Sequence, residues 1–176
     1  FCEYTGQRIR KVNPDGTIHT MAGTGKKTGK DGNGDGGPAL QATFNLPHEI
    51  RFDKDGNYYI ADMTNHAIRK VDAKTGIITT FAGTSGKAGY SGDGGPASKA
   101  ELKQPHSIQF GADGNLYICD IGNNVIRRVD MATGVISTCP SCQPAATNAR
   151  LITCKASPVR LSGPRTERIA ISRLAR

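Results

Sequence analysis

Short apolar runs alternate with polar turns along this chain, and each run is too short for a typical helix. Residues 48–52, 58–62, 67–72 and 77–82 are β-rich runs, separated by turns that contain Gly, Asn, Asp or Thr. No stretch keeps the 3.6-residue period of an amphipathic helix for a useful length. The pattern therefore predicts an all-β protein in which four antiparallel strands form a meander.

Several runs are apolar at consecutive positions, as in residues 58–61. A strand with one wet face should alternate, so these strands are predicted to be covered on both faces. A β-propeller blade lies between two neighbouring blades and meets that condition, whereas a sandwich or a β-helix is the alternative. The four-strand unit with a long return loop favours a propeller.

The four-strand unit recurs 58 residues later, which means that each copy hides its apolar faces against its neighbours. The long return loop, residues 83–104, contains a predicted helical turn at residues 97–102 and leads from the outer edge of one blade to the next inner strand. The recurring segments are Pro47-His48 with Pro105-His106, Tyr59-Ile60-Ala61-Asp62 with Tyr117-Ile118-Cys119-Asp120, Ile68-Arg69-Lys70-Val71 with Ile126-Arg127-Arg128-Val129, and Gly34-Asp35-Gly36-Gly37-Pro38 with Gly92-Asp93-Gly94-Gly95-Pro96.

The repeat divides the chain into four expected segments. Residues 1–45 hold the end of a first blade and a Gly-rich linker, residues 46–104 a complete blade with its long linker, and residues 105–138 a further blade. Residues 139–176 leave the pattern and are expected to form a poorly ordered basic tail. Because the chain starts in the middle of a repeat, we expect a fragment whose remaining blades belong to the same polypeptide.

The composition, with 22 glycines, nine prolines and no tryptophan, agrees with many short strands joined by turns. The net charge of +8 does not indicate nucleic-acid binding, because seven of the basic residues lie in residues 139–176 and the repeat region is nearly neutral. No run approaches the roughly 20 apolar residues of a membrane helix. Cys2 and Cys119 share a repeat position and read as small buried residues, and the Cys139–Cys142 spacing lacks the setting of a redox motif.

The segment Asn65-His66-Ala67-Ile68-Arg69-Lys70-Val71 resembles the signature of NHL repeats, and residues 123–129 are a looser copy. The linker, with Ala82-Gly83-Thr84 and residues 91–97, is similar to that of secreted bacterial NHL proteins. The resemblance covers residues 1–138. It implies a β-propeller, commonly of six blades, of which this chain supplies about half, and an extracellular or periplasmic location.

The two Pro-His motifs open inner strands that ring one mouth of a propeller channel, so His48 and His106 can converge. Neutral imidazole is the commonest transition-metal ligand, and the motif resembles the zinc-binding segments of peptidyl-hydroxyglycine amidating lyase. That resemblance implies zinc ligands at His48 and His106, with Glu49 nearby as a base or further ligand. Unlike the lyase ligands, these come from adjacent blades, and Arg165 replaces a third histidine. The alternative is that each imidazole bonds backbone.

The recurring acids have a structural and a functional interpretation. Residues 31–36 match the start of a calcium loop, but Ala42 stands where a bidentate Glu is needed, so Asp35 and Asp93 are interpreted as turn residues. Asp62 and Asp120 end the second strand and are expected to bond the backbone of the following turn, and the alternative is that these carboxylates line the channel. The pairs Arg69-Lys70 and Arg127-Arg128 are expected to lay their aliphatic stems across neighbouring blades with their charged heads in water, and a surface for polyanions is the alternative.

The resulting hypothesis is an NHL-type propeller segment that serves as a scaffold for a protein or small-molecule ligand. Glu49 and Arg165 are the candidate ligand-binding residues beside the histidines. The alternative is a metal-dependent lyase or lactone hydrolase with its site at the channel mouth, and a passive structural array is a third reading. No catalytic residue is assigned. Zinc and calcium are the cofactors that the motifs suggest.

Overall fold

The computed structural model describes residues 1–29, 32–139, 153–155 and 168–170, and the sheets in these residues are antiparallel. The strands follow chain order in three main sheets, with a further two-stranded pair. The first sheet contains β1 (Cys2–Glu3), β2 (Arg8–Val12) and β3 (Ile18–Ala22); the second β4 (Pro47–Phe52), β5 (Tyr58–Asp62), β6 (Ala67–Val71) and β7 (Ile78–Ala82); the third β8 (Pro105–Phe110), β9 (Leu116–Asp120), β10 (Val125–Val129) and β11 (Ile136–Thr138); and the pair β12 (Thr153–Lys155) and β13 (Arg168–Ala170).

The predicted four-stranded meander is confirmed in the second and third sheets, which makes the fold all-β and a partial β-propeller. Four short 3₁₀ helices lie between strands: η1 (Ala39–Gln41), η2 (Met63–Asn65), η3 (Ala97–Lys99) and η4 (Ile121–Asn123). The helical turn expected over residues 97–102 is shorter than predicted, because the backbone returns to an extended conformation at Ala100.

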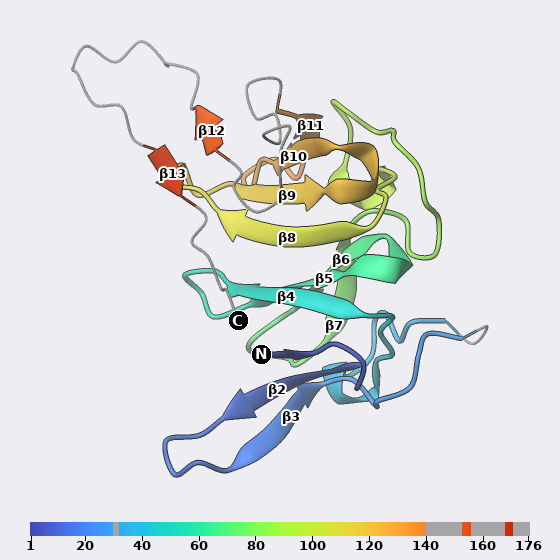
Figure 1. Ribbon diagram of the computed structural model, residues 1–176, viewed down its shortest axis with the longest axis vertical. Coiled ribbons are helices and arrows are strands. Elements are labelled where there is room, and N and C mark those ends of the chain that lie inside the picture. Colours follow the sequence, from blue (N-terminus) through green and yellow to red (C-terminus); the bar gives the residue numbers. More distant parts are fainter. Residues whose placement is uncertain (30–31, 140–152, 156–167, 171–176) are drawn as a thin grey trace.

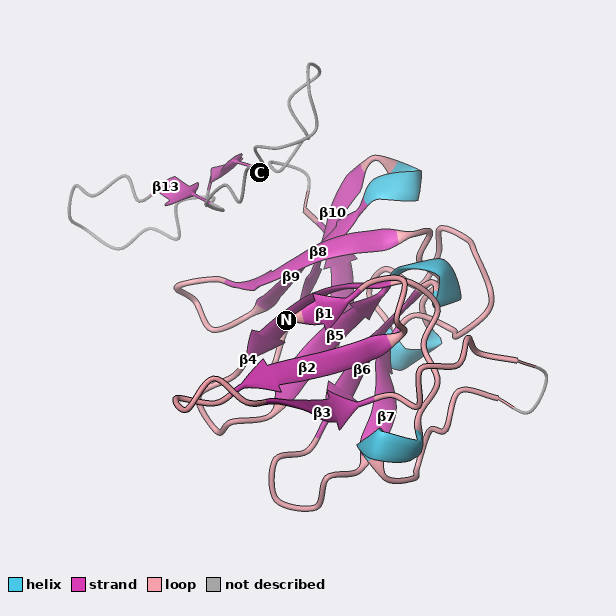
Figure 2. Cartoon of the chain, turned by 60° about the horizontal axis from the view of Figure 1, so that its bottom comes forward, coloured by secondary structure: helices cyan, strands magenta, loops and turns pink. Residues whose placement is uncertain are grey.

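The three sheets lie side by side in chain order, and the view in Figure 2 shows the same succession from another direction. Two apolar layers fill the spaces between them. The layer between the first and second sheets includes Ile9, Ala22, Phe44, Ile60 and Ile78, all fully buried. The layer between the second and third sheets contains Tyr59, Ile68, Leu102, Ile108, Leu116 and Ile118, among others.

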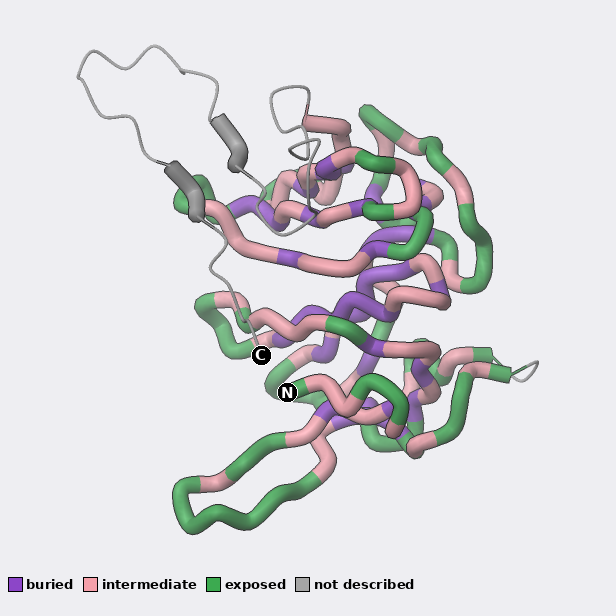
Figure 3. The backbone as a smooth tube through the Cα atoms, viewed as in Figure 1, coloured by how far each residue is buried: buried purple, intermediate pink, exposed green. Residues whose placement is uncertain are grey.

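Strand β5 is buried at all five positions, as its consecutive apolar residues predict. It has one sheet on either side, so neither of its faces meets water (Figure 3). In β9, by contrast, buried positions alternate with half-buried ones, because one face of the strand packs on the second sheet and the other does not. A similar strand sequence therefore has a different burial pattern in the two copies.

Each Gly-rich linker pairs with the outer strand of the sheet that follows it. The Gly36 amide donates to the Ile78 carbonyl at 2.8 Å, and the Ile78 amide donates to Gly37 at 3.0 Å. The third sheet repeats this arrangement, with Gly94 donating to Ile136 at 2.8 Å. The linkers thus cover backbone groups at the outer edges of the second and third sheets, which would otherwise be open to pairing with another chain. Apart from Cys139, β12 and β13, the expected basic tail lies outside the described residues.

Candidate functional site

A β-bulge opens the inner strand at each Pro-His motif. Strand β4 pairs with β5 at Pro47 and again at Glu49, and the register shifts between these two positions. His48 is therefore an extra residue without a partner on β5. Strand β8 shifts in the same way after Pro105, which leaves His106 unpaired. A bulge re-aims a side chain, and here it turns both imidazoles out of their own sheets.

The two imidazoles lie against each other across the boundary between the second and third sheets. Their ring centroids are 3.4 Å apart and their planes are tilted by 36°. Tyr4, which directly follows β1, packs edge-on against His48 with a centroid separation of 5.8 Å and an interplanar angle of 83°. We call Tyr4, His48 and His106 the mouth cluster, since three successive sheets each contribute one ring to it.

The surroundings of the two imidazoles favour their neutral forms. Partial burial lowers the pKa of His48, although the charge of Glu49 and a hydrogen bond to the His106 backbone oppose that shift. Partial burial also lowers the pKa of His106, and the neighbouring His48 adds to the effect. The Nδ1 atom of His106 lies 3.1 Å from the Ser107 hydroxyl. At neutral pH the two rings can therefore stack without mutual charge repulsion.

Tyr4 was missed in the analysis of the sequence, although the repeat contains a signal for it. Tyr4, Met63 and Ile121 hold the same repeat position, one residue after the acid that ends the second strand of each copy. Tyr4 and Ile121 keep 39% and 36% of their surface exposed. The position is therefore apolar in every copy and accessible in at least two.

Glu49 connects the inner strands of two sheets. One of its carboxylate oxygens accepts the Ile108 amide at 2.9 Å, and the other forms an ion pair with Arg51. Arg51 in turn donates to the side-chain oxygen of Gln109 at 2.8 Å. Both oxygens are thus engaged, so a role for Glu49 as a base or ligand requires one of these bonds to be exchanged. The other candidate ligand-binding residue, Arg165, lies outside the described residues.

The described residues fit a zinc site only in part. His48 and His106 supply two imidazole nitrogens, and their lowered pKa values favour the neutral form that binds metals. A catalytic zinc, however, takes three protein ligands and a structural zinc four. No group of three or more His, Cys, Asp or Glu side chains within the described ranges is placed to hold a metal ion. The mouth cluster by itself therefore offers an incomplete donor set for zinc.

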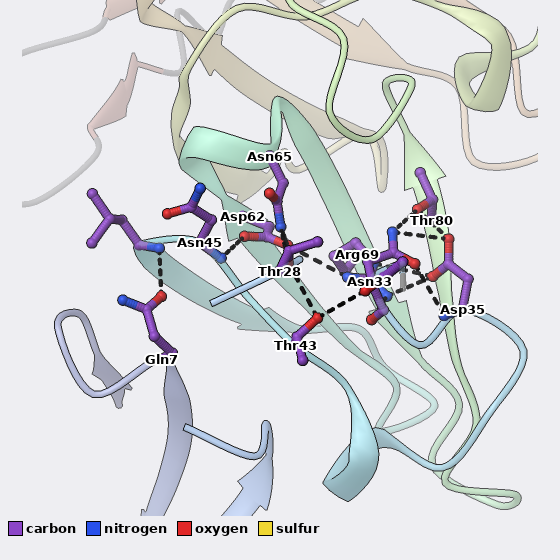
Figure 4. Close-up of polar contacts among 12 residues, drawn as sticks. Gln7, Thr28, Asn33, Asp35, Thr43, Asn45, Asp62, Asn65, Arg69 and Thr80 are labelled. Carbon is purple, nitrogen blue, oxygen red and sulfur yellow. Dashed lines mark hydrogen bonds and ion pairs between the residues drawn. The ribbon is translucent and has the colours of Figure 1, made fainter. Parts of the chain in front are cut away.

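Arg69 is the centre of a buried polar network in the second sheet (Figure 4). Its guanidinium, which is fully buried, contacts Asp35 at 2.6 Å and Asp62 at 3.4 Å and donates to the Asn33 carbonyl at 3.2 Å. The expectation that this cation reaches water is wrong, because two acids and a carbonyl surround it inside the protein. Asp35 comes from the linker, so the network fastens the linker to its sheet.

The Asp62 carboxylate accepts hydrogen bonds from donors other than the backbone of the following turn. It makes no side-chain bond to the backbone of the helix η2 that follows it. Instead it accepts the Asn45 amide, 17 residues upstream, at 2.8 Å, and the Asn65 side-chain amide at 2.8 Å. Burial raises the pKa of Asp62 to about 6, and these donors together with the Arg69 cation oppose that shift.

The third sheet repeats the network with the same residue types. Arg127 is fully buried, contacts Asp93 at 2.7 Å and lies 3.9 Å from Asp120. Asp120 accepts the Lys103 amide at 2.7 Å and the Asn123 side chain at 2.8 Å. The recurrence shows that the acids at both repeat positions hold linkers and arginines in place.

The calcium alternative does not fit the residues that the structure describes in the first linker. Asp35 already forms an ion pair with Arg69 and also accepts the Thr80 hydroxyl. The Asn33 side-chain oxygen accepts the Asp35 amide at 3.1 Å, so it is used inside the turn. Asp31, the first position of the loop, lies outside the described residues.

Cys2 in β1 and Cys119 in β9 are free thiols at half-buried positions. Burial raises the pKa of Cys2 to about 12 and that of Cys119 to about 11, so both favour the protonated form at neutral pH. Both side chains were expected to be buried, and both are half-buried. Cys139 is disulfide-bonded, a pairing that the sequence analysis did not anticipate.

A family model described as the teneurin NHL domain matches residues 13–90. The repeats of this chain are therefore similar to NHL repeats. The NHL repeat-containing protein 2 of Homo sapiens is 31% identical over 106 residues, which cover 59% of this chain and 14% of that protein. The chloroplastic protein SUPPRESSOR OF QUENCHING 1 of Arabidopsis thaliana is 34% identical over 98 residues, covering 56% of this chain and 9% of that protein. The NHL-repeat chain therefore spans a small part of these relatives.

Among solved structures, an auxiliary nutrient binding protein from Bacteroides ovatus has a similar fold. The TM-score is 0.56 at 21% sequence identity, and the match covers 77% of this chain and 33% of that one. Within the described part of the NHL-repeat chain, no helix is both long and apolar enough to span a membrane.

Proposed function

We propose that this NHL-repeat chain is a binding scaffold and that the mouth cluster is part of its ligand-binding surface. The observation that carries the proposal is the pair of bulges at His48 and His106, which bring two imidazoles from different sheets to a centroid separation of 3.4 Å. A bulge disrupts a sheet ladder locally, so its recurrence at the same repeat position favours a use for the side chain that it redirects.

The chemistry of the cluster suits a ligand that combines an apolar or aromatic group with hydrogen-bonding groups. The exposed ring of Tyr4 and the apolar Ile121 offer contact area, and neutral imidazoles offer one donor and one acceptor each. A protein segment and a small molecule are both compatible with this surface. A solved protein of similar fold is described as nutrient-binding, which supports the proposal only as an analogy of fold.

Peptide selection tests the scaffold proposal. A displayed random-peptide library would be selected on the full chain, and a small-molecule panel would be screened by thermal shift. Ligands found in this way should lose binding to the double variant His48→Ala/His106→Ala. They should keep binding to His19→Ala, since His19 lies on β3 in the first sheet. Ligands that bind both variants equally would show that recognition occurs elsewhere.

The same proposal includes export to an extracellular or periplasmic space, in a bacterium as the linker resemblance implies. The disulfide at Cys139 supports it, because disulfides persist mainly in oxidising compartments. Fractionation of cells that express the full-length protein checks the location, and a protein found only in the cytosolic fraction contradicts it.

A metal-dependent lyase or lactone hydrolase is the second candidate function. It is favoured by the lowered pKa values of His48 and His106, which keep both imidazoles neutral and able to bind a metal. Metal analysis of the full-length protein separates it from the scaffold proposal. Stoichiometric zinc that is lost in both His48→Ala and His106→Ala supports the enzyme. Absence of metal, or its retention in both variants, removes this candidate.

A further inference from the structure

One hydrogen bond recurs at the junctions between sheets. At the first junction, the side-chain oxygen of Gln7 accepts the Leu46 amide at 2.7 Å. At the second junction, the Nδ1 atom of His66 accepts the Gln104 amide at 3.1 Å. Gln7 lies between β1 and β2, and His66 lies at the equivalent place between β5 and β6. In each case the donor immediately precedes the proline that opens the next inner strand.

The backbone around this bond is alike at both junctions. Gln7 and His66 have φ angles of 53° and 58°, and Leu46 and Gln104 have φ angles of 57° and 54°. Non-glycine residues are uncommon in this left-handed region. Four such residues at two equivalent places indicate that the fold holds the donor and the acceptor in a fixed mutual orientation.

The two junctions differ in the chemistry of the acceptor. The Gln7 amide does not titrate and is buried, with 2% of its surface exposed. His66 is half-buried and can accept only while Nδ1 is unprotonated, which places its proton on Nε2. Protonation of His66 gives the ring two N–H groups, and Nδ1–H would then face the N–H of Gln104. The bond would become a donor–donor contact.

We propose that the junction between the second and third sheets is a pH-sensitive latch. The latch is closed, with the Gln104–His66 hydrogen bond formed, when His66 is neutral, and it opens when His66 takes up a proton. The Gln7–Leu46 hydrogen bond stays formed in both protonation states of His66. Because Gln104 is followed by Pro105 and His106, opening the latch loosens the segment that presents His106 to His48. Acid would thus loosen one side of the mouth cluster selectively.

The electrostatic surroundings of His66 set the direction of the switch. Partial burial lowers the pKa of His66, and the positive charge of Lys103 lowers it further. The folded state therefore binds this proton more weakly than the unfolded chain, so the stability that the latch supplies is present at neutral pH and decreases below about pH 6.5. The charged and titratable groups on the elements that pack against η2 and His66 are Asp62, His48, Glu49, Arg51, Arg69, Lys70, Lys103 and His106.

Two of these groups need separate attention in an experiment. His106 also titrates in acid and lies two residues from Gln104, so it could change the Gln104 signal without His66. Asp62 gains a proton near pH 6, directly before η2. A variant at His66 alone distinguishes the latch from both effects, because it leaves His106 and Asp62 in place.

The test is amide hydrogen exchange of the full chain, measured residue by residue by NMR between pH 5 and pH 8 and corrected for intrinsic exchange. In the wild type, the protection of the Gln104 amide should fall about fivefold on acidification, the effect of losing one hydrogen bond of typical net strength. The protection of the Leu46 amide should not change. In His66→Gln, which copies the Gln7 junction, Gln104 should stay protected throughout this pH range.

A second measurement needs no variant. Long-range ¹H–¹⁵N spectra of the wild type at pH 8 report which nitrogen of His66 carries the proton, and the proposal requires Nε2. A proton on Nδ1, or Gln104 protection that does not respond to pH, overturns the proposal. Loss of Gln104 protection in acid that persists in His66→Gln also overturns it, because another group would then be responsible.

Discussion

Replacing Arg69 with methionine should destabilise the protein more than the same change at its neighbour Lys70 on β6. The guanidinium is completely buried and is shared between Asp35, Asp62 and the Asn33 carbonyl. Methionine fills a similar volume but leaves the fully buried Asp62 carboxylate without its cation. Breaking a buried ion pair by removing one partner typically costs about 3–5 kcal/mol. We expect a loss in that range at pH 7.

The loss should be smaller in acid. Burial raises the pKa of Asp62 to about 6, so at pH 5 this carboxyl is largely protonated in the folded wild type as well. The variant then lacks only the bonds of Arg69 to Asp35 and Asn33. The double variant Arg69→Met/Asp62→Asn should likewise recover part of the stability at pH 7, since it removes the uncompensated charge together with its partner.

Urea unfolding followed by circular dichroism measures these differences, with wild type and variants compared at pH 7 and pH 5. Lys70→Met is the matched control, because Lys70 is the next residue on β6 and lies 5.8 Å from the ring of Tyr59 with its charge partly in water. The control should lose less than about 1 kcal/mol. A loss in Arg69→Met no larger than that of Lys70→Met would show that the buried network does not stabilise the blade.

Three further outcomes are expected. Gly83→Ala should cost about 2 kcal/mol, because a Cβ would lie 2.4 Å from the His66 carbonyl at a φ of +87°; Gly76→Ala, with open space around a φ of +69°, should cost less in the same urea titration. Ile60→Ala should lose about 2–5 kcal/mol, since Ile60 is fully buried between two sheets, and a loss below 1 kcal/mol would contradict that packing. Cys119 should react with iodoacetamide at pH 8 about 100-fold more slowly than an unperturbed cysteine, because burial raises its pKa to about 11; mass spectrometry of the alkylated peptide checks this rate.

The local pattern of apolar and turn residues was enough to predict the strands of the repeat. Strand and turn preferences act between near neighbours, so the apolar runs and the Asp-Gly turns already indicate where the second and third sheets bend. The consecutive apolar residues of β5 predicted cover on both faces, and the structure shows all five positions buried. The resemblance of residues 65–71 to the NHL signature agrees with the family model that matches residues 13–90.

Only part of the candidate site could be predicted from the sequence. The recurrence of His48 and His106 placed them at equivalent positions, but their contact depends on a bulge, which the sequence pattern does not reveal. Tyr4 was missed because its neighbour, His48, belongs to another sheet. Arg69 was expected in water, since its acid partner Asp35 lies 34 residues earlier in the linker.

Sequence by itself thus determined the all-β class, the order of the strands and the repeat that stacks them, because these follow from local propensity and from self-similarity. Only the tertiary structure decided which polar groups are buried together, how the linkers close the edges of the sheets, and which rings meet at the mouth. Those contacts join residues from different sheets, and their energies depend on distance and burial that no single segment contains.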